Sequence, residues 1–166
     1  MYIDAQQLVN FYSSSLGGKV KKRIFKKISS FLRPLAGEVW LGMDYALPYF
    51  DQVKEREGLK CALAFMSMRQ GAVQAWPHRE ESCTAIVDPE MLPLAESSVD
   101  KILLIHCLEF SKNPHLLLEE LARVLKTQGE MVIIVPNRLG IWAHAEGTPF
   151  GYGVPYSQYQ LLKLLH

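Results

Sequence analysis

Five short apolar runs, separated by segments of helical character, constrain the fold of this chain most. They cover residues 38–41, 60–65, 84–87, 101–106 and 131–135. Each run is continuously apolar rather than alternating, which is typical of strands that are buried on both faces of a parallel sheet. The pattern predicts an α/β fold, a Rossmann-like parallel sheet of about five strands with helices on both faces.

Helices are expected between and after these runs. The predicted segments are 45–57, 70–76, 114–126 and 157–165. The segment 114–126 has the clearest periodicity, with a wide apolar face. That face is predicted to hold Leu116, Leu117, Leu121, Val124 and Leu125.

The N-terminus is predicted to form a helical arm, residues 1–34, ahead of the α/β domain at 35–166. A first short helix would have Asp4 as its N-cap, since Asp side chains accept hydrogen bonds from the first turn. Its inward side chains would be Leu8, Val9 and Tyr12. Gly17 and Gly18 are expected to separate this helix from the next one, because glycine interrupts helices.

The second helix, predicted at 19–32, is strongly basic. Seven basic residues and no acidic residue lie from Lys19 to Arg33, whereas residues 34–166 hold 11 basic and 16 acidic residues. Val20, Ile24 and Ile28 recur at helical spacing, so the helix has one apolar stripe and one cationic face. We favour packing of the stripe on the domain as a cover, with solvated lysines; contact of residues 19–33 with anionic lipid or RNA is the alternative.

Composition agrees with a single domain of 166 residues that can bury a core, since 49% of the residues are hydrophobic and the mean hydropathy is +0.03. No apolar run approaches the ~20 residues of a membrane span. We therefore expect a cytoplasmic protein. Cys61, Cys83 and Cys107 are widely spaced among apolar residues, which favours free thiols over disulfides, and no metal site is predicted.

The stretch 84–137 adds a more specific signal. An Asp follows the third run, and a Leu-Pro loop comes next. A second Asp precedes the fourth run. After the fourth run, a helix ending in Arg-Val-Leu-Lys leads through a Gly to the fifth run. The residues are Asp88, Leu92, Pro93, Asp100, Arg123, Val124, Leu125, Lys126 and Gly129. In order and spacing this stretch resembles the second half of class I S-adenosylmethionine (SAM)-dependent methyltransferases of the small-molecule type 11 family.

The resemblance implies SAM as cofactor, but the first half of the chain departs from the family. The family has a three-glycine loop after the first strand, where this chain has Gly42 and Asp44. Either Gly42 is the first glycine and Asp44 replaces the second, or Gly42 takes an acidic position and Asp44 replaces the first. The family's ribose-binding acid after the second strand is also missing, because residues 66–69 hold no carboxylate. SAM binding is expected to be weak, unless Asp44 substitutes for the missing acid.

Further cofactor-site candidates follow the third and fourth runs. The resemblance implies that Asp88 accepts a hydrogen bond from the adenine amine and that Met91 helps to wall the ring; the alternative for Asp88 is a turn residue before Pro89. His106 would line the cleft or act as a capping residue, and the alternative is a general base oriented by Glu109. The candidate cofactor-binding residues are Gly42, Asp44, Asp88, Met91 and His106.

After the fifth run the family adds two antiparallel strands, for which this chain has no counterpart. Either the chain is a fragment, or its tail, a homodimer or another partner covers the exposed edge of the fifth strand. The Gly- and Pro-rich tail would either cover the substrate mouth or anchor Trp142 and Phe150 in the core.

The resemblance implies methyl transfer to a small molecule, and the alternative is a binding or scaffold protein that kept the fold without the chemistry. Methylation of nucleic-acid bases is disfavoured. Enzymes of that kind carry an Asp/Asn-Pro-Pro-aromatic sequence after the fourth strand, and this chain has His106 followed by Cys107 and Leu108.

Overall fold

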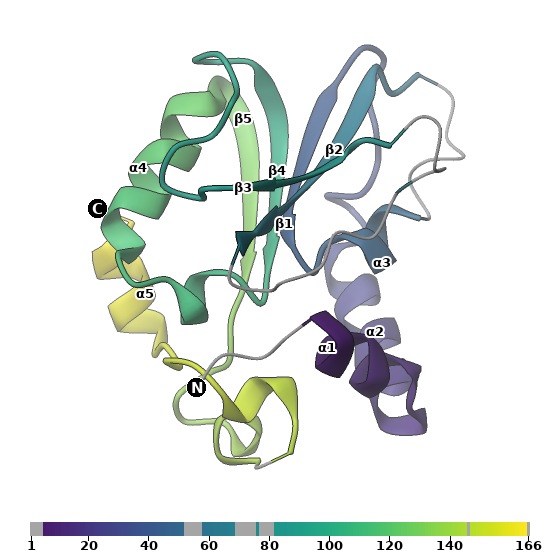
Figure 1. The fold of residues 1–166 in the computed structure, drawn as a ribbon, viewed down its shortest axis with the longest axis vertical. Coiled ribbons are helices and arrows are strands. Elements are labelled where there is room, and N and C mark those ends of the chain that lie inside the picture. The colour runs from purple at the N-terminus through teal and green to yellow at the C-terminus, as the bar shows by residue number, and fades with distance from the viewer. Residues whose placement is uncertain (1–4, 52–57, 69–75, 77–81, 146, 166) are drawn as a thin grey trace.

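The computed structural model describes residues 5–51, 58–68, 76, 82–145 and 147–165. A five-stranded sheet lies at its centre, and all four neighbouring pairs of strands are parallel, in the order β3-β2-β1-β4-β5 (Figure 1). The strands are β1 (Val39–Asp44), β2 (Cys61–Ser67), β3 (Thr84–Val87), β4 (Val99–Ile105) and β5 (Leu125–Ile134). The predicted Rossmann-like α/β fold is confirmed.

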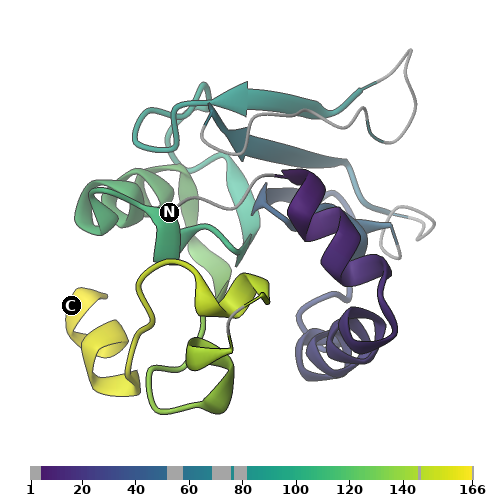
Figure 2. The ribbon, with the colours of Figure 1, turned by 60° about the horizontal axis from the view of Figure 1, so that its bottom comes forward.

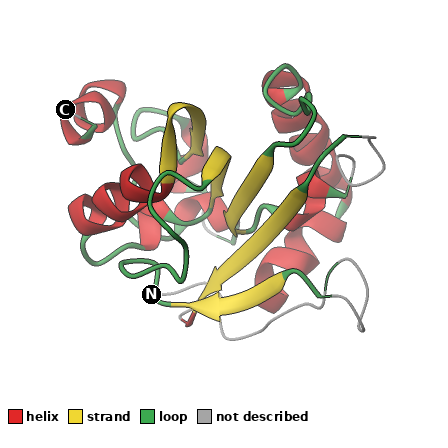
Figure 3. Cartoon of the chain, turned by 90° about the horizontal axis from the view of Figure 1, so that it is seen from above, coloured by secondary structure: helices red, strands yellow, loops and turns green. Residues whose placement is uncertain are grey.

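Helices cover both faces of this sheet (Figure 3). The α-helices are α1 (Ala5–Ser13), α2 (Ser15–Ile28), α3 (Leu47–Phe50), α4 (Pro114–Val124) and α5 (Gln158–Leu164). Three short 3-10 helices follow β4 and β5: η2 (Leu108–Phe110), η3 (Ile141–His144) and η4 (Pro149–Gly151). Among the described residues, no helix combines the length and apolar character needed to cross a bilayer.

The core has two apolar layers because the strands are buried on both sides. On one face the strands pack against α4, through Leu41, Met43, Ile102, Leu104, Leu117 and Leu121. On the other face they pack against α2, the turns that follow it, and α3, through Trp40, Leu103, Ile105, Ile28, Leu32 and Phe50. The continuous apolar runs of the sequence thus supply alternate residues to two separate layers.

The N-terminal helices differ from the prediction in where they divide. The break lies at Ser14, whose Oγ accepts a hydrogen bond from Gly17 N at 3.0 Å and caps α2. Gly17 and Gly18 are therefore inside α2, and the prediction that they separate the helices is wrong. Gly17 is required by packing instead, since a Cβ there would overlap the Phe11 carbonyl of α1.

Two inward faces were also partly mispredicted. In α1, Leu8 and Tyr12 are buried but Val9 is exposed. In α4, Leu118 is buried whereas Leu116 is exposed. Leu117, Leu121 and Val124 of α4 are buried as predicted.

Several predicted helix ends shift as well. Helix α2 ends at Ile28, and Phe31 and Leu32 are buried in the turns that follow. Helix α4 ends at Val124 because Leu125 already pairs with Val99 as the start of β5. Of the predicted helix 45–57, the segment Leu47–Phe50 forms α3. Residues 52–57 lie outside the described residues, as do Asp4 and nearly all of the predicted helix 70–76.

Strand β5 forms one edge of the sheet, as the sequence predicted. Beyond the end of β5 the tail folds back, and Asn137 forms a β-bridge with Tyr156. Arg138 N donates a hydrogen bond to Tyr156 O, and Tyr156 N donates one to Pro136 O. Leu161 and Leu164 of α5 then pack on the α4 face of the core. The tail covers the carboxyl end of β5, while no strand of the described residues pairs with its outer edge.

Candidate functional site

The carboxyl ends of the strands form the candidate site, because ligands of parallel α/β sheets bind beyond these ends. Asp44 ends β1, Ser67 ends β2, Asp88 follows β3 and His106 follows β4. The strand order places Asp44, Ser67 and Asp88 on three neighbouring strands. Helix α1 and the tail lie at the same edge, which Figure 2 turns toward the viewer.

Asp44 is a buried carboxylate, with 3% of its surface exposed. Its Oδ1 accepts a hydrogen bond from Ser67 N at 2.8 Å, so it ties the end of β1 to the end of β2. Burial raises the pKa of Asp44 to about 6, although the bond from Ser67 acts in the opposite direction. The residue also has a left-handed backbone, with φ 56°, a conformation that Asp tolerates better than most residues.

Gly42 lies within β1 rather than in a loop, paired with Ala64 and Leu103 on the two sides. A Cβ at this position would stand 2.5 Å from Ala46 Cβ and 2.9 Å from Phe50 Cε2. Glycine therefore allows α3 and its preceding turn to close onto the strand. This packing accounts for Gly42 without any ligand.

Asp88 closes the turn after β3, where one of its carboxylate oxygens accepts a hydrogen bond from Glu90 N at 3.0 Å. Asp88 therefore acts as a turn residue before Pro89, which was the alternative to adenine binding in the sequence analysis. Asp88 is nevertheless exposed, and Met91, which bridges to it, is 74% exposed. Both residues are accessible to a ligand at this edge.

His106 is 1% exposed and joins two distant segments of the chain. Its Nε2 lies 2.9 Å from Tyr12 Oη of α1, and its Nδ1 lies 3.0 Å from Glu109 Oε1 of η2. Glu109 contacts His106, as the alternative role of His106 requires. The sequence predicted that Tyr12 faces inward but not that it contacts His106. Burial, followed by the nearby Tyr49, raises the pKa of Tyr12, which keeps its phenol neutral.

Aromatic rings surround this hydrogen-bonded chain. Tyr12 stacks on Tyr45 at 4.8 Å between ring centroids, and Phe150 of the tail lies 5.0 Å from the His106 ring. We call Tyr12, Tyr45, His106, Glu109 and Phe150 the aromatic cluster. It covers the ends of β1 and β4 and closes part of the edge at which a cofactor would enter.

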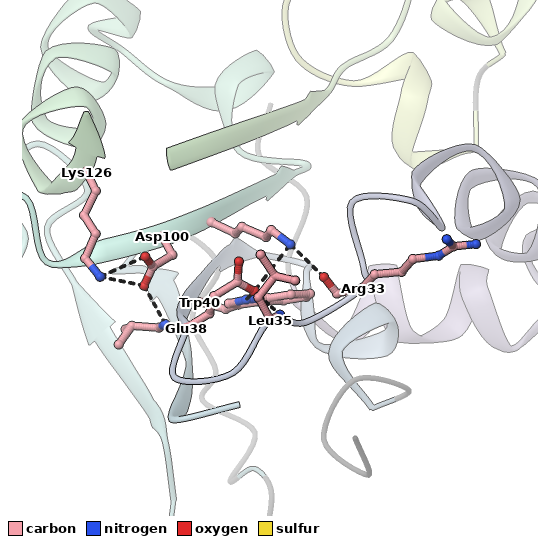
Figure 4. Close-up of polar contacts among 8 residues, drawn as sticks. Arg33, Leu35, Glu38, Trp40, Asp100 and Lys126 are labelled. Atoms are coloured by element: carbon pink, nitrogen blue, oxygen red, sulfur yellow. Dashed lines mark hydrogen bonds and ion pairs between the residues drawn. The ribbon is translucent and has the colours of Figure 1, made fainter. Parts of the chain in front are cut away.

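The residues behind the family resemblance lie largely at the opposite, amino end of the sheet. Asp100 accepts hydrogen bonds from Val39 N and from Lys126 Nζ, each at 2.8 Å (Figure 4). Partial burial acts to raise the pKa of Asp100, but these bonds outweigh it and the pKa is lowered. Asp100 and Lys126 therefore fasten β1, β4 and β5 together.

Lys101 extends this amino-end network. Its Nζ donates to the Arg33 carbonyl at 2.8 Å and lies 3.4 Å from Glu38 Oε2. Glu38 also accepts hydrogen bonds from Leu35 N and Trp40 Nε1 (Figure 4). The Lys101 ammonium stands 4.8 Å from the Trp40 ring centroid, within cation–π range.

The Leu-Pro loop is also held by the scaffold. Leu92 N donates to Glu120 Oε1 at 2.6 Å, and Arg123 Nη2 donates to the Leu92 carbonyl at 3.3 Å. Arg123 and Glu120 in turn form an ion pair on α4. Gly129 sits where a Cβ would stand 2.9 Å from the Asp100 carbonyl, so a larger residue would push β5 from β4.

A comparison with protein-family models finds a match to the methyltransferase domain at residues 86–133. These residues carry the signature described above, together with β4 and the bonds that hold it. The chain has a methyltransferase fold. A search of curated proteins finds no significant match.

Solved structures of methyltransferases resemble this fold over most of the chain. A SAM-dependent methyltransferase from Thermotoga maritima is 16% identical, with a TM-score of 0.58 over 89% of this chain and 74% of its own. The Haemonchus contortus phosphoethanolamine N-methyltransferase 2, solved with S-adenosylhomocysteine, is 16% identical, with a TM-score of 0.59 over 86% of this chain and 35% of its own.

A third similar structure carries a different activity. The [4+2]-cyclase SpnF is 20% identical, with a TM-score of 0.61 over 86% of this chain and 55% of its own. At these identities the comparisons establish the methyltransferase fold, and the reaction has to be argued from the site.

Proposed function

We propose that this chain is a SAM-dependent methyltransferase domain that acts on a small molecule and binds its cofactor weakly. The observation that carries the proposal is the accessible carboxylate of Asp88, which follows β3 inside the matched segment, at the same edge of the sheet as the ends of β2 and β1. A carboxylate in this position can accept a hydrogen bond from the adenine amine.

The fit of SAM to the described residues is partial. Asp88 and Met91 would hold the adenine. The Asp44 carboxylate is already engaged with Ser67 N and is buried, and beyond Ser67 the exposed side chain is Met68 rather than an acid. A hydrogen bond to a charged group contributes ~1.5–3 kcal/mol, so loss of the ribose-binding acid lowers affinity by roughly ten- to a hundredfold.

SAM supplies an electrophilic methyl group, and methyl transfer chiefly requires that a nucleophile be held in line with it. Proximity and orientation can provide most of such a rate enhancement. The protein's part is to exclude water and fix the acceptor, and Tyr45 and Phe150 at the strand ends supply apolar surfaces for this. The Tyr12–His106–Glu109 chain would position the strand ends rather than exchange a proton with the acceptor.

Calorimetric titration with SAM and S-adenosylhomocysteine tests the proposal. We expect dissociation constants of tens of micromolar or higher for the native chain, and Asp88→Ala should weaken binding at least tenfold because the adenine acceptor is lost. Glu90→Ala is the matched control, since it removes a carboxylate from the same turn and keeps the backbone donor to Asp88. Equal affinity of Asp88→Ala and Glu90→Ala would contradict the role of Asp88.

A second candidate is a binding or scaffold protein that uses the fold without SAM. The aromatic cluster favours it, because Tyr12 of α1 stacks on Tyr45 and binds His106 at the edge where the cofactor would enter. Tyr12→Ala opens this space. If neither the native chain nor Tyr12→Ala binds SAM or S-adenosylhomocysteine, the scaffold candidate replaces the methyltransferase proposal.

A further inference from the structure

A groove of about 620 Å³ lies between α2 and the carboxyl end of β5. It is separate from the Asp44 and Asp88 positions but shares Phe150 with the aromatic cluster. Helix α2 lines one side of the groove, and the end of β5 with the tail after it lines the other. These segments are more than one hundred residues apart in the sequence, and Figure 2 shows the ribbons of α2 and of the tail. Its volume is within the range of pockets that hold small molecules.

The inner surface of this groove is apolar. Helix α2 contributes Val20 and Ile24, β5 contributes Ile134, and the tail contributes Trp142 and Phe150. These side chains offer aliphatic and aromatic contacts to a ligand. A ligand that fills it would therefore bury an apolar chain or ring.

The charges on the groove are of one sign. Lys19 and Arg23 are one helical turn apart on α2, both are exposed, and both line the groove. Among the described residues no carboxylate forms an ion pair with either cation, and no acidic residue lines the groove. Arg binds phosphates and carboxylates through charge-assisted hydrogen bonds, and Lys adds a second positive charge.

We propose that this groove binds a small amphipathic anion, an apolar chain carrying a phosphate or carboxylate. The apolar chain of the ligand lies on Val20, Ile24, Ile134 and Phe150. Its anionic head group lies between Lys19 and Arg23. An RNA strand has no long apolar part for this surface, and the groove is large enough to take a single chain without a bilayer. Binding in the groove does not depend on methyl transfer, so failure of the proposed function leaves this inference standing.

Calorimetry with monomeric decyl phosphate, below its micelle concentration, tests the proposal on the whole chain. The double variant Lys19→Gln/Arg23→Gln should weaken binding about tenfold or more, since both head-group contacts are lost. The double variant Lys22→Gln/Lys26→Gln is the matched control: it removes the same charge from exposed positions of α2 that do not line the groove. This control should change the affinity less than about threefold.

Two further probes separate the contribution of the ligand's alkyl chain from that of its head group. Decanol lacks the charge and inorganic phosphate lacks the chain, so each should bind at least ten times more weakly than decyl phosphate. Val20→Ser should weaken decyl phosphate severalfold and leave the salt dependence of binding unchanged, because the two cations remain.

Equal weakening by the two double variants would overturn the proposal, since the basic helix would then act as a general polyanion surface. Binding to anionic phosphatidylglycerol vesicles or to single-stranded RNA, with no binding of monomeric decyl phosphate, would overturn it as well. Thermal melting of each variant identifies any loss of folding, and a folded Lys19→Gln/Arg23→Gln protein that keeps native affinity is a third contradicting result.

Discussion

The polar groups at the two ends of the sheet differ in how completely they are paired. At the amino end, Lys101 forms an ion pair with Glu38. Asp100 accepts hydrogen bonds from Lys126 Nζ and Val39 N. At the carboxyl end, Asp44 keeps a raised pKa, and among the described residues Glu109 Oε2 has no hydrogen-bond partner. Polar groups that are fully paired stabilise a scaffold, whereas buried titratable groups that lack full pairing are typical of functional edges.

The segment that matches the methyltransferase domain contains polar groups from both ends of the sheet, since Asp88, His106 and Glu109 of the carboxyl end also lie within residues 86–133. The match at residues 86–133 includes Asp100, Lys126 and the Glu120–Arg123 pair that holds Leu92. These residues maintain the strand arrangement and do not by themselves specify a reaction. Gly42 and Asp44, where the sequence departs from the family pattern, lie in β1 and outside the matched segment.

The largest effect is expected at the amino end. Lys101→Ala should lower the free energy of unfolding by about 3 kcal/mol, because breaking a buried ion pair leaves an unmatched charge on Glu38. Urea denaturation measures the effect, and Lys60→Ala, at an exposed lysine beside β2, is the control. A loss below about 1 kcal/mol for Lys101→Ala would mean that the network is not needed for stability.

A smaller effect of opposite sign is expected at the carboxyl end. The pKa of Asp44 in the folded chain is raised from 3.8 to about 6, so the folded state binds the proton more tightly than the unfolded state does. The Asp44 contribution to stability is therefore largest at low pH and is lost as the pH rises through about 6. Above that pH the charged carboxylate destabilises the fold.

Asp44→Asn should remove this pH dependence, since Asn is nearly the same size and can still accept from Ser67 N. Near pH 8 we expect the variant to be more stable than the native chain by about 1–2 kcal/mol, with the gain disappearing toward pH 4. Urea denaturation across this range tests it, with Asp88→Asn as the exposed control. A gain that is independent of pH would assign the effect to the left-handed backbone instead.

The smallest effect is expected for the link between α1 and β4. Tyr12→Phe removes the hydroxyl that lies 2.9 Å from His106 Nε2 and should cost about 1 kcal/mol of stability. Tyr159→Phe, at an exposed tyrosine of α5, is the control and should cost nothing measurable. If Tyr12→Phe also leaves the free energy of unfolding unchanged, packing against Tyr45 rather than the hydrogen bond holds α1 at this edge.

Much of the fold follows from local sequence patterns. The run 84–87 became β3 with the predicted bounds, and the last helix begins after Ser157, whose side chain forms a capping box with Gln160. Such elements depend on neighbouring residues, because apolar runs and caps act over a few positions. The order of the signature residues over residues 84–137 likewise predicted the methyltransferase fold.

The tertiary structure decided what depends on distant residues. Gly17 is glycine because Phe11 of α1 packs against it, and Leu125 leaves the helix because Val99 pairs with it. Tyr12 meets His106 across 94 residues, and the groove joins Lys19 to Phe150. Periodicity shows that a side chain faces inward but not which partner it meets, since that depends on how the strands and helices assemble around the sheet.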